Sequence, residues 1–571
     1  MFHRSYSILL LIVLAGTIFG TSQVYSMLPE EPTVSLVKVN LHSAAEIDQF
    51  QALKIPAYAR LNGRSGEFIL IKTDPTGLYT LSQTSLTFQV LDKNVSDNPY
   101  YLVYLRPDRV AIKAVDYGRV LWAEASQYLL QTNTVKAELL LEAGAEINRI
   151  GEQPIVWAAS MEPIPSIAVI EPEPTIQEMI NQVNSSTVNK YNGDLSGEWP
   201  VIIDGSPYTI NTRYTYSGES IQKATQYVGQ HFTDLGLDVE YHQWSGITYP
   251  NVIGEITGRT NPDEVYIVSA HLDDLPSGAT APGADDNGSG STAALIAADI
   301  FSQYEWNCTI RFGLWTGEEQ GLDGSEAYAQ RAHNQGENIA GVLNLDMIAY
   351  DSDTDPILDL HARTAIPGSI VIANTFVDVV DAYQLDLQPD ILIDNWLGNY
   401  SDNKSFWDEG YSAILAIEDD DDFTPHYHTT SDQLSTLNIE YFTEFTKAAV
   451  GTFAHMTGCL LVDSTGQLNG HVTNAADMTP INNVSLALTG MISTTLTTNP
   501  AGYYSSTLPI GAYTITTSAP GYMSVTKNVS IQSEVITTQD FALPEYFYQF
   551  LPIIGKESFE YTKFVSLAEN S

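Results

Sequence analysis

The sequence has very few cysteines. Only Cys308 and Cys459 occur among 571 residues. This number excludes a scaffold built on several disulfides, and it excludes a zinc site made of thiolates. A single bridge is compatible with an oxidising compartment, and two separately buried thiols are equally compatible with the sequence. Both alternatives stay open at this stage.

Basic residues are also scarce. The chain has 25 Lys and Arg residues against 69 Asp and Glu residues, for a formal net charge of −44. Such a surface does not neutralise a phosphate backbone, so nucleic acid is excluded as a partner and anionic membrane surfaces are disfavoured. The simplest explanation of the charge is the solubility of an exported protein.

Long apolar runs are missing beyond the first residues. Residues 1–26 have the pattern of a secretory signal peptide, with His3 and Arg4 ahead of an apolar core at 8–19 and a cleavage edge at Ser26. No cysteine typical of a lipid anchor follows. No later run reaches the ~18 residues that a membrane helix requires. We therefore expect a secreted protein without a membrane span.

The remaining chain is long enough for two to four domains. Pattern and composition predict five parts, and the first of them reads as two similar halves of alternating strands and helices. The parts are an N-terminal α+β region at 27–160, a Pro-rich acidic linker at 161–175, a large domain at 176–461, a β-rich domain at 463–545 and a tail at 546–571.

The large domain alternates apolar strands with helices. This pattern predicts an α/β fold with a mostly parallel central sheet and helices on both faces. Functional sites in such sheets lie at the carboxyl ends of the strands. The β-rich domain has short alternating runs that predict a β-sandwich. Its segments 499–504 and 509–514 resemble the carboxypeptidase regulatory-like fold, which implies contact with a cell surface or a polysaccharide.

His and carboxylate residues follow several predicted strands of the large domain. Carboxylates gathered without compensation at one sheet edge would repel one another, and a pair of divalent cations would remove that conflict. One imidazole and one carboxylate for each metal, with a shared Asp, suits zinc and leaves a position for water. The candidate residues are His271, Asp273, Asp285, Glu318, Glu319, Asp346 and His428.

The order and spacing of these motifs resemble the M28 family of zinc aminopeptidases, in particular secreted bacterial leucine-type enzymes. The motifs are H-x-D at 271–273, A-D-D-N-x-S-G at 284–290, G-E-E-x-G-L-x-G-S at 317–325, N-L-D-M at 344–347 and H-T-x-x-D at 428–432. The resemblance implies a metallopeptidase that removes N-terminal residues, apolar ones above all, from peptides with a free N-terminus. It also implies that the region at 27–160 is a propeptide or an appended module.

The same resemblance implies a role for each candidate residue. It assigns two zinc ions to five ligands, with Asp285 bridging them, and it makes Glu318 the general base that takes a proton from the attacking water. Asp273 would orient a zinc-bound imidazole from behind. The five implied ligands are His271, Asp285, Glu319, Asp346 and His428.

Other functions remain open from the sequence. A carboxypeptidase-type enzyme or a glutaminyl cyclase of the same superfamily is the nearest enzymatic alternative, although the cyclases hold one zinc and lack the full ligand set. A binding protein without catalysis is the alternative from another class, but such a protein would normally have lost a ligand or the base. The acidic run at 418–422 is a candidate calcium site, and an exposed acidic loop is the simpler interpretation.

Overall fold

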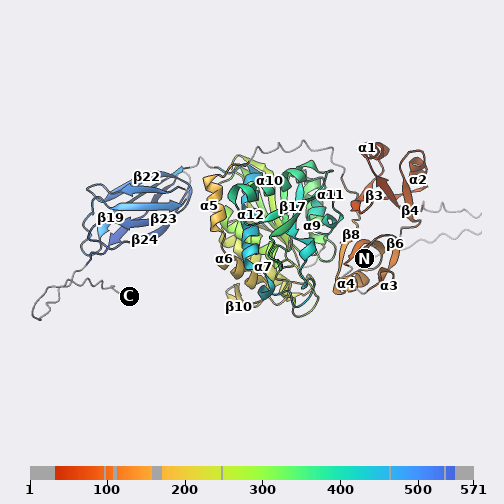
Figure 1. The fold of residues 1–571 in the computed structure, drawn as a ribbon, viewed down its shortest axis with the longest axis horizontal. Coiled ribbons are helices and arrows are strands. Elements are labelled where there is room, and N and C mark those ends of the chain that lie inside the picture. Colours follow the sequence, from red (N-terminus) through yellow and green to blue (C-terminus); the bar gives the residue numbers. More distant parts are fainter. Residues whose placement is uncertain are drawn as a thin grey trace, which may run out of the picture.

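The computed structural model describes residues 33–95, 98–106, 112–156, 170–245, 249–461, 465–490, 492–532 and 535–546. The predicted signal peptide, residues 161–169 of the predicted linker and the tail after its first residue lie outside this part of the chain. Three bodies follow one another along the longest axis of the molecule (Figure 1). We call them the N-terminal module (33–156), the central domain (170–461) and the C-terminal domain (465–546). Among the described residues, no helix is long and apolar enough to cross a membrane.

The N-terminal module consists of two halves with the same topology. Each half runs strand, helix, strand, strand, helix, strand, and the two four-stranded sheets have the equivalent orders β2-β3-β1-β4 and β6-β7-β5-β8. The internal repeat is therefore present, but the sequence pattern missed one strand in each half, β2 and β7. The elements are β1 Ser35–Leu41, α1 Ala44–Leu53, β2 Ala57–Gly63, β3 Gly66–Thr73, α2 Pro75–Ser82, β4 Phe88–Asp92, β5 Tyr100–Leu105, α3 Ala114–Tyr117, β6 Arg119–Glu124, β7 Gln127–Gln131, α4 Thr134–Glu142 and β8 Ala145–Arg149.

The central domain contains an eight-stranded sheet of order β11-β12-β14-β13-β15-β18-β16-β17. Strands β13, β14, β15 and β18 are parallel to one another, whereas β11, β12 and the β16–β18 pair introduce antiparallel contacts. The predicted mixed α/β architecture is confirmed. The strands are β9 Val201–Ile203, β10 Ser206–Tyr208, β11 Asp238–His242, β12 Asn251–Ile256, β13 Asn261–His271, β14 Cys308–Trp315, β15 Asn338–Leu345, β16 Ile357–Ala362, β17 Gln388–Ile393 and β18 Ala413–Glu418.

Helices cover both faces of this sheet. Alternate residues of β13 enter different cores, because successive side chains of a strand point to opposite faces: Tyr266 and Val268 join the core under α8, α10 and α12, and Ile267 joins the core under α9 and α11. The helices are α5 Pro174–Gln182, α6 Ser185–Leu195, α7 Glu219–Asp234, α8 Gly288–Phe301, α9 Asp323–Gln335, α10 Pro367–Tyr383, α11 Asn403–Asp408 and α12 Ile439–Thr457, with short 3-10 turns η1 Trp396–Asn399, η2 Asp420–Asp422 and η3 Leu434–Thr436.

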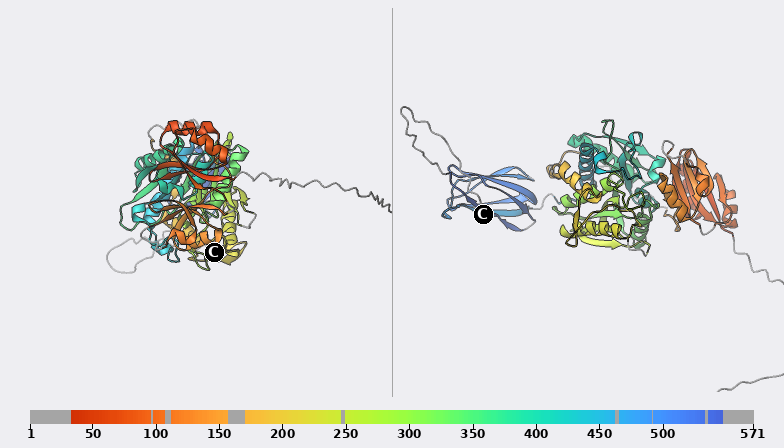
Figure 2. Two further views of the ribbon diagram at one scale, coloured as in Figure 1. Left: turned by 90° about the vertical axis from the view of Figure 1, so that its right-hand side faces the viewer. Right: turned by 90° about the horizontal axis from the view of Figure 1, so that it is seen from below.

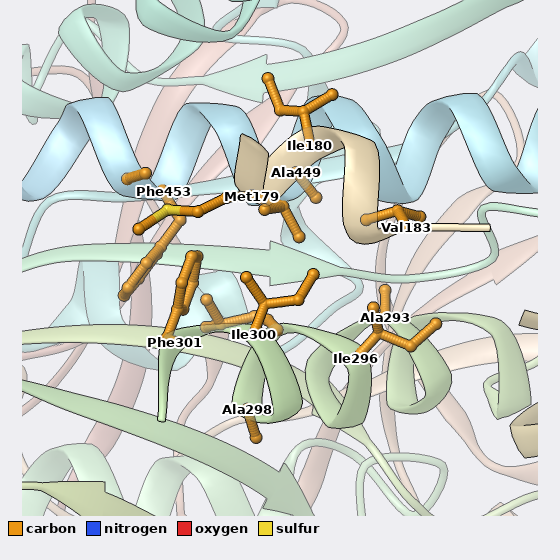
Figure 3. Close-up of a cluster of buried hydrophobic side chains, with 14 of the residues drawn as sticks. Met179, Ile180, Val183, Ala293, Ile296, Ala298, Ile300, Phe301, Ala449 and Phe453 are labelled. Atoms are coloured by element: carbon orange, nitrogen blue, oxygen red, sulfur yellow. The ribbon is translucent and has the colours of Figure 1, made fainter. Parts of the chain in front are cut away.

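Helix α8 is buried on nearly all sides, which fixes the turn just before it. Its side chains meet those of α5 and α12 in one apolar cluster (Figure 3), and the rings of Phe301 and Phe453 stack with centroids 5.4 Å apart. The Asn287 side chain caps the helix by accepting a hydrogen bond from the Gly290 amide, at 2.8 Å. The residues that directly precede Asn287 are therefore held rigidly.

A disulfide joins Cys308 to Cys459, with Cα atoms 5.8 Å apart and 151 residues between them in sequence. Of the two alternatives that the sequence left open, a single bridge and two separately buried thiols, the structure has the bridge. Cys308 opens β14 and Cys459 follows α12, and the Asn307 amide donates to the Cys459 carbonyl beside the bridge. The bridge therefore ties the last helix to the amino end of a central strand.

Removing this disulfide is expected to destabilise the central domain. The Cys308→Ser/Cys459→Ser double variant should lose about 2–5 kcal/mol of unfolding free energy, because the unfolded chain is no longer constrained by a long loop. Urea unfolding of both proteins measures the difference, and intact mass after alkylation, with and without reduction, verifies the bridge in the wild type. Equal midpoints for the two proteins would contradict the expectation.

The C-terminal domain contains two four-stranded sheets, β22-β19-β25 with β26 beside β19, and β21-β20-β23-β24. Residues that alternate along β23 are buried, as expected for strands with one face toward a core. The strands are β19 Thr465–Asn474, β20 Ser485–Gly490, β21 Thr494–Thr497, β22 Tyr503–Pro509, β23 Gly511–Ser518, β24 Thr526–Ile531, β25 Ile536–Thr538 and β26 Phe541–Leu543.

Candidate metal centre

The carboxyl ends of the parallel strands bring the candidate residues together. His271 is the last residue of β13, and Asp346 directly follows β15. Glu318 and Glu319 lie in the turn after β14, and His428 lies in the loop that follows β18. All are buried, with at most 7% of each residue exposed. The sheet thus converts distant sequence positions into one compact site.

Two groups of potential ligands share the carboxylate of Asp286. One Asp286 oxygen lies 3.2 Å from Nε2 of His271, which is also 3.1 Å from an Asp346 oxygen. The other oxygen lies 3.3 Å from Nε2 of His428, which is 2.9 Å from a Glu319 oxygen. In each group the potential ligand atoms lie within 4.8 Å of one another. The arrangement therefore offers two adjacent cation positions with Asp286 between them.

The prediction that Asp285 occupies the bridging position is wrong. One Asp285 carboxylate oxygen accepts a hydrogen bond from the Ala349 amide at 3.0 Å, and the Asp285 carboxyl group shares a hydrogen bond with Glu418. Asp285 belongs to neither of the two ligand groups. Its side chain points away from the histidines because neighbouring residues of this turn face different directions. Asp286, one residue later, takes the place that the sequence analysis gave to Asp285.

Glu318 lies beside the two ligand groups that share Asp286, but it belongs to neither of them. One of its carboxylate oxygens lies 4.0 Å from Nε2 of His271, and together with His271 and Glu319 it forms a third group of potential ligands. Burial raises the pKa of Glu318 well above its usual range, and the neighbouring Glu319 carboxylate adds to the effect. A carboxylate in this position is a strong proton acceptor beside the metal positions.

Asp273 supports the site from behind. Its carboxylate lies 3.7 Å from Nδ1 of His271, and the same ring nitrogen is 3.1 Å from the Asp273 carbonyl. The carboxylate also accepts the amides of Glu318 and Glu319, at 3.3 and 3.4 Å, and the Thr215 hydroxyl at 2.7 Å. Asp273 therefore lies behind the His271 imidazole, and it also holds the turn that carries both glutamates.

Two further supporting residues were not found from the sequence as site residues. The Ser401 hydroxyl donates to an Asp346 oxygen at 2.6 Å. The Asp432 carboxylate accepts the amides of Asp285 and Asp286, at 2.9 and 3.0 Å. Asp432 ends the H-T-x-x-D motif, so that motif was a usable signal for it. Ser401 lies in no such motif, and only the fold brings it to the site.

The electrostatics of the site favour positive charge. Burial alone would lower the pKa of His428, but the facing Glu319 and Asp286 carboxylates raise it to about 10. Burial likewise opposes charge on His271, but Asp346 and Glu318 raise the pKa of that imidazole well above its usual range. A proton or a divalent cation between these groups is therefore strongly stabilised.

The imidazole nitrogens and carboxylate oxygens of the two ligand groups are better suited to bind metal ions than to pair with one another through protons. Among the described residues, the other oxygen of Glu319 is buried and makes no hydrogen bond. Each of the two positions offers one imidazole nitrogen, one terminal carboxylate and one oxygen of Asp286. Nitrogen and oxygen ligands in this number suit zinc and leave a coordination position free for water.

Comparison with known families agrees with this geometry. Residues 251–452 match the model of peptidase family M28, and residues 467–544 match the carboxypeptidase regulatory-like domain. The first match spans the strands and loops that carry every residue of the two ligand groups. The α/β fold and its two adjacent ligand groups thus lie in a region that is similar to peptidase family M28.

Individual relatives are similar over part of their length. A protein named as a probable aminopeptidase of Saccharomyces cerevisiae is 29% identical over 232 residues, which are 38% of this chain and 60% of the relative. Leucine aminopeptidase 1 of Trichophyton rubrum is 35% identical over 217 residues, which are 35% of this chain and 56% of the relative. The chain thus spans roughly half of the length of these curated relatives.

A solved structure shares the fold. The LapA aminopeptidase of Legionella pneumophila superposes with a TM-score of 0.50 at 17% identity, over 63% of this chain and 99% of that chain. The identity is low, so this likeness supports the architecture alone.

Proposed function

We propose that this protein is an aminopeptidase with two zinc ions, which hydrolyses N-terminal residues from peptides. The observation that carries the proposal is the pair of ligand groups joined by the two oxygens of Asp286, with Glu318 beside them. The match to peptidase family M28 and the similarity to a leucine aminopeptidase and to a probable aminopeptidase support the same activity. The substrates are peptides with a free N-terminus, and the preferred N-terminal residues are apolar.

In this proposal five residues hold the metal ions. They are His271, Asp286, Glu319, Asp346 and His428. When bound, zinc polarises the scissile carbonyl and lowers the pKa of water, which supplies a nucleophile near neutral pH. Glu318 accepts the proton of the attacking water and passes it to the leaving amine, which balances the reaction without another acid. Asp273 and Ser401 hold His271 and Asp346 in the required orientation.

The direction of cleavage distinguishes the proposal from its nearest alternatives. A carboxypeptidase-type enzyme would remove residues from the carboxyl end, and a glutaminyl cyclase would act on an N-terminal glutamine without shortening the peptide. A binding protein would change neither end. The complete set of ligands and the base at Glu318 favours catalysis over binding alone, because each of these residues is costly to keep buried without a metal.

A chelator should abolish activity, and zinc should restore it. On leucyl-nitroanilide we expect loss of turnover after dialysis against a chelator and recovery when zinc is added back, because the carboxylates and imidazoles lose the cations between them. Peptides with free and acetylated N-termini, analysed by mass spectrometry, test the direction. Trimming of the acetylated peptide, or trimming from the carboxyl end, would contradict an aminopeptidase.

We also propose that the protein is exported, with residues 1–26 removed as a signal peptide. The disulfide between Cys308 and Cys459 supports this location, because such bridges persist in oxidising compartments. We propose the division of the chain into a region at 27–160, a linker at 161–175, a peptidase domain at 176–461, a domain at 463–545 and a tail at 546–571. The three bodies described above support this division, and the central body already includes Ile170 and the first residues of α5 from the predicted linker. Sequencing the N-terminus of the exported protein tests the cleavage edge.

A further inference from the structure

The N-terminal module packs against the edge of the central domain that carries the candidate metal centre. The Arg149 amide donates to the Gly321 carbonyl at 3.3 Å, in the turn that begins with the two glutamates, and its guanidinium contacts Asp323 at 3.3 Å. The Asn148 side chain donates to the Asn399 carbonyl at 2.7 Å. Two views of the chain place the module directly beside the central domain (Figures 1 and 2).

Both halves of the module take part in this contact. The Asn399 side chain donates to the carbonyl of Asn62, in the first half, at 2.9 Å. Tyr104, in the second half, contacts the Trp396 ring edge-on, with centroids 4.5 Å apart. Buried Arg363 of the central domain donates to the carbonyl of Arg60 at 3.1 Å. Several buried polar groups are thus paired across the contact between the module and the central domain.

Arg106 is a residue of the module that lines the pocket of the candidate metal centre. Its guanidinium donates to Glu146, also of the module, and to Asp420 of the central domain, each at 2.8 Å. It also lies over the ring of Phe423, with its central carbon 3.3 Å from the ring centroid. Only 9% of the Arg106 side chain is exposed. A desolvated cation held by two carboxylates and an aromatic ring is a strong anchor.

Arg106 and Glu146 form one wall of the pocket that contains the ligand groups. This pocket has a volume of about 550 Å³ and is also lined by His271, Asp286, Glu318, Glu319, Asp346, Phe423 and Tyr427. Among the described residues, no hydrogen bond or ion pair joins the module to a residue of the two ligand groups. The module therefore closes the far side of the pocket and leaves the ligand positions free.

Arg106 contacts the loop opposite the ligand groups at two residues. Asp420 lies in the acidic run at 418–422, and Phe423 directly follows it. Without the guanidinium, Asp420 would face the neighbouring carboxylates uncompensated, and the Phe423 ring would lose one of its contacts while keeping its edge-on contact with Tyr427. Loss of Arg106 would therefore let this wall move outward.

We propose that the N-terminal module is part of the working enzyme and that Arg106 limits substrates to short peptides by fixing this wall. The inference rests on the proposed aminopeptidase function and adds a substrate class to it. The pocket has about 550 Å³ of empty space, which includes its open mouth, and Arg106 and Glu146 bound it on the side of the module. In this proposal a long peptide continues past the ligand groups toward the wall that Arg106 and Glu146 form, whereas a dipeptide ends before that wall.

The test compares a dipeptide with a long peptide that starts with the same two residues, using full-length protein. In Arg106→Ala, the ratio of kcat/KM for the dipeptide to kcat/KM for the long peptide should fall by about tenfold or more, which is the discrimination that one pocket contact gives. The fall should come mainly from a gain on the long peptide. Asp420→Asn, which breaks the same ion pair from the central domain, should shift the ratio in the same direction.

Arg119→Ala is the matched control. Arg119 belongs to the same module and pairs with Asp92 within it, away from the pocket lining. The ratio of kcat/KM for the dipeptide to kcat/KM for the long peptide should be the same in Arg119→Ala as in the wild type. Thermal unfolding verifies that each variant is folded. If Arg106→Ala does not fold, the ratio measured for Asp420→Asn tests the inference.

An unchanged ratio in Arg106→Ala and Asp420→Asn, with active wild type, would overturn this inference alone. Equal gains on both substrates would overturn it in favour of a module that inhibits the enzyme. A wild type that cleaves neither substrate would overturn the proposed function, and this inference with it.

Discussion

Glu318→Gln is expected to keep the zinc content of the wild type and to lose about 10²–10⁴-fold in kcat. Glutamine has nearly the same size as glutamate and still forms hydrogen bonds, but its amide does not accept the proton of the attacking water. Glu318 lies beside the ligand groups and is outside the arrangement that Asp286 bridges. The substitution therefore removes a proton acceptor and leaves each metal position its own ligands.

Glu319→Gln is the matched comparison, because it is the same substitution one residue later. Glu319 faces His428 at 2.9 Å within one ligand group. We expect this variant to lose one zinc ion or to bind it weakly, with activity partly restored by excess zinc. Zinc stoichiometry by mass spectrometry, together with kcat for both variants, decides between the roles. Loss of zinc in Glu318→Gln alone would reverse the two assignments, and full turnover in both would place the reaction elsewhere.

Much of the site follows from the sequence because strand ends are easy to recognise. His271, Glu319 and Asp346 follow apolar runs that become parallel neighbours in one sheet, so their convergence follows from the α/β alternation. His428 was found by its motif, since the loop that carries it has no regular pattern. The structure brings all four together with Glu318, as the sequence analysis expected.

The sequence does not determine which of two adjacent aspartates points into the site. Asp285 and Asp286 are identical in type and share the same motif, and their backbone amides both donate to Asp432. Only the path of the turn into α8 separates their side chains: one meets Ala349 and Glu418, and the other meets both histidines. That path depends on the packing of α8, which sequence spacing does not record.

Contacts between distant segments were also beyond the sequence. Ser401 lies 130 residues after His271 in a region without a motif. The hairpin strands β2 and β7 bury small or polar residues such as Ala57, Asn62 and Gln127, so their apolar alternation is weak. The position of Arg106 in the pocket wall depends on how two separately folded bodies meet. Polar pairing across such a contact has no period along the chain, so pattern analysis does not detect it.

Asp286→Asn is expected to lose zinc and activity, whereas Asp285→Asn is expected to keep both, although the two residues are neighbours of the same type. The side-chain amide of asparagine at position 286 has one uncharged oxygen, whereas the carboxylate has two charged oxygens. The amide therefore does not bridge two cations. We expect zinc affinity to fall by more than the ~10–100-fold that loss of an outer supporting group costs, and activity to fall with it.

Asp285→Asn should keep the zinc content of the wild type and stay within about tenfold of its kcat/KM, below the effect expected for a metal ligand. The Asp285 carboxyl group already shares a proton with Glu418, and burial raises its pKa to about 7. An amide there still accepts the Ala349 amide and donates to Glu418 without adding charge, so the local hydrogen bonds survive. Zinc stoichiometry and kcat/KM of the two variants, measured side by side, provide the comparison. Loss of zinc in Asp285→Asn with full occupancy in Asp286→Asn would return the bridging role to Asp285.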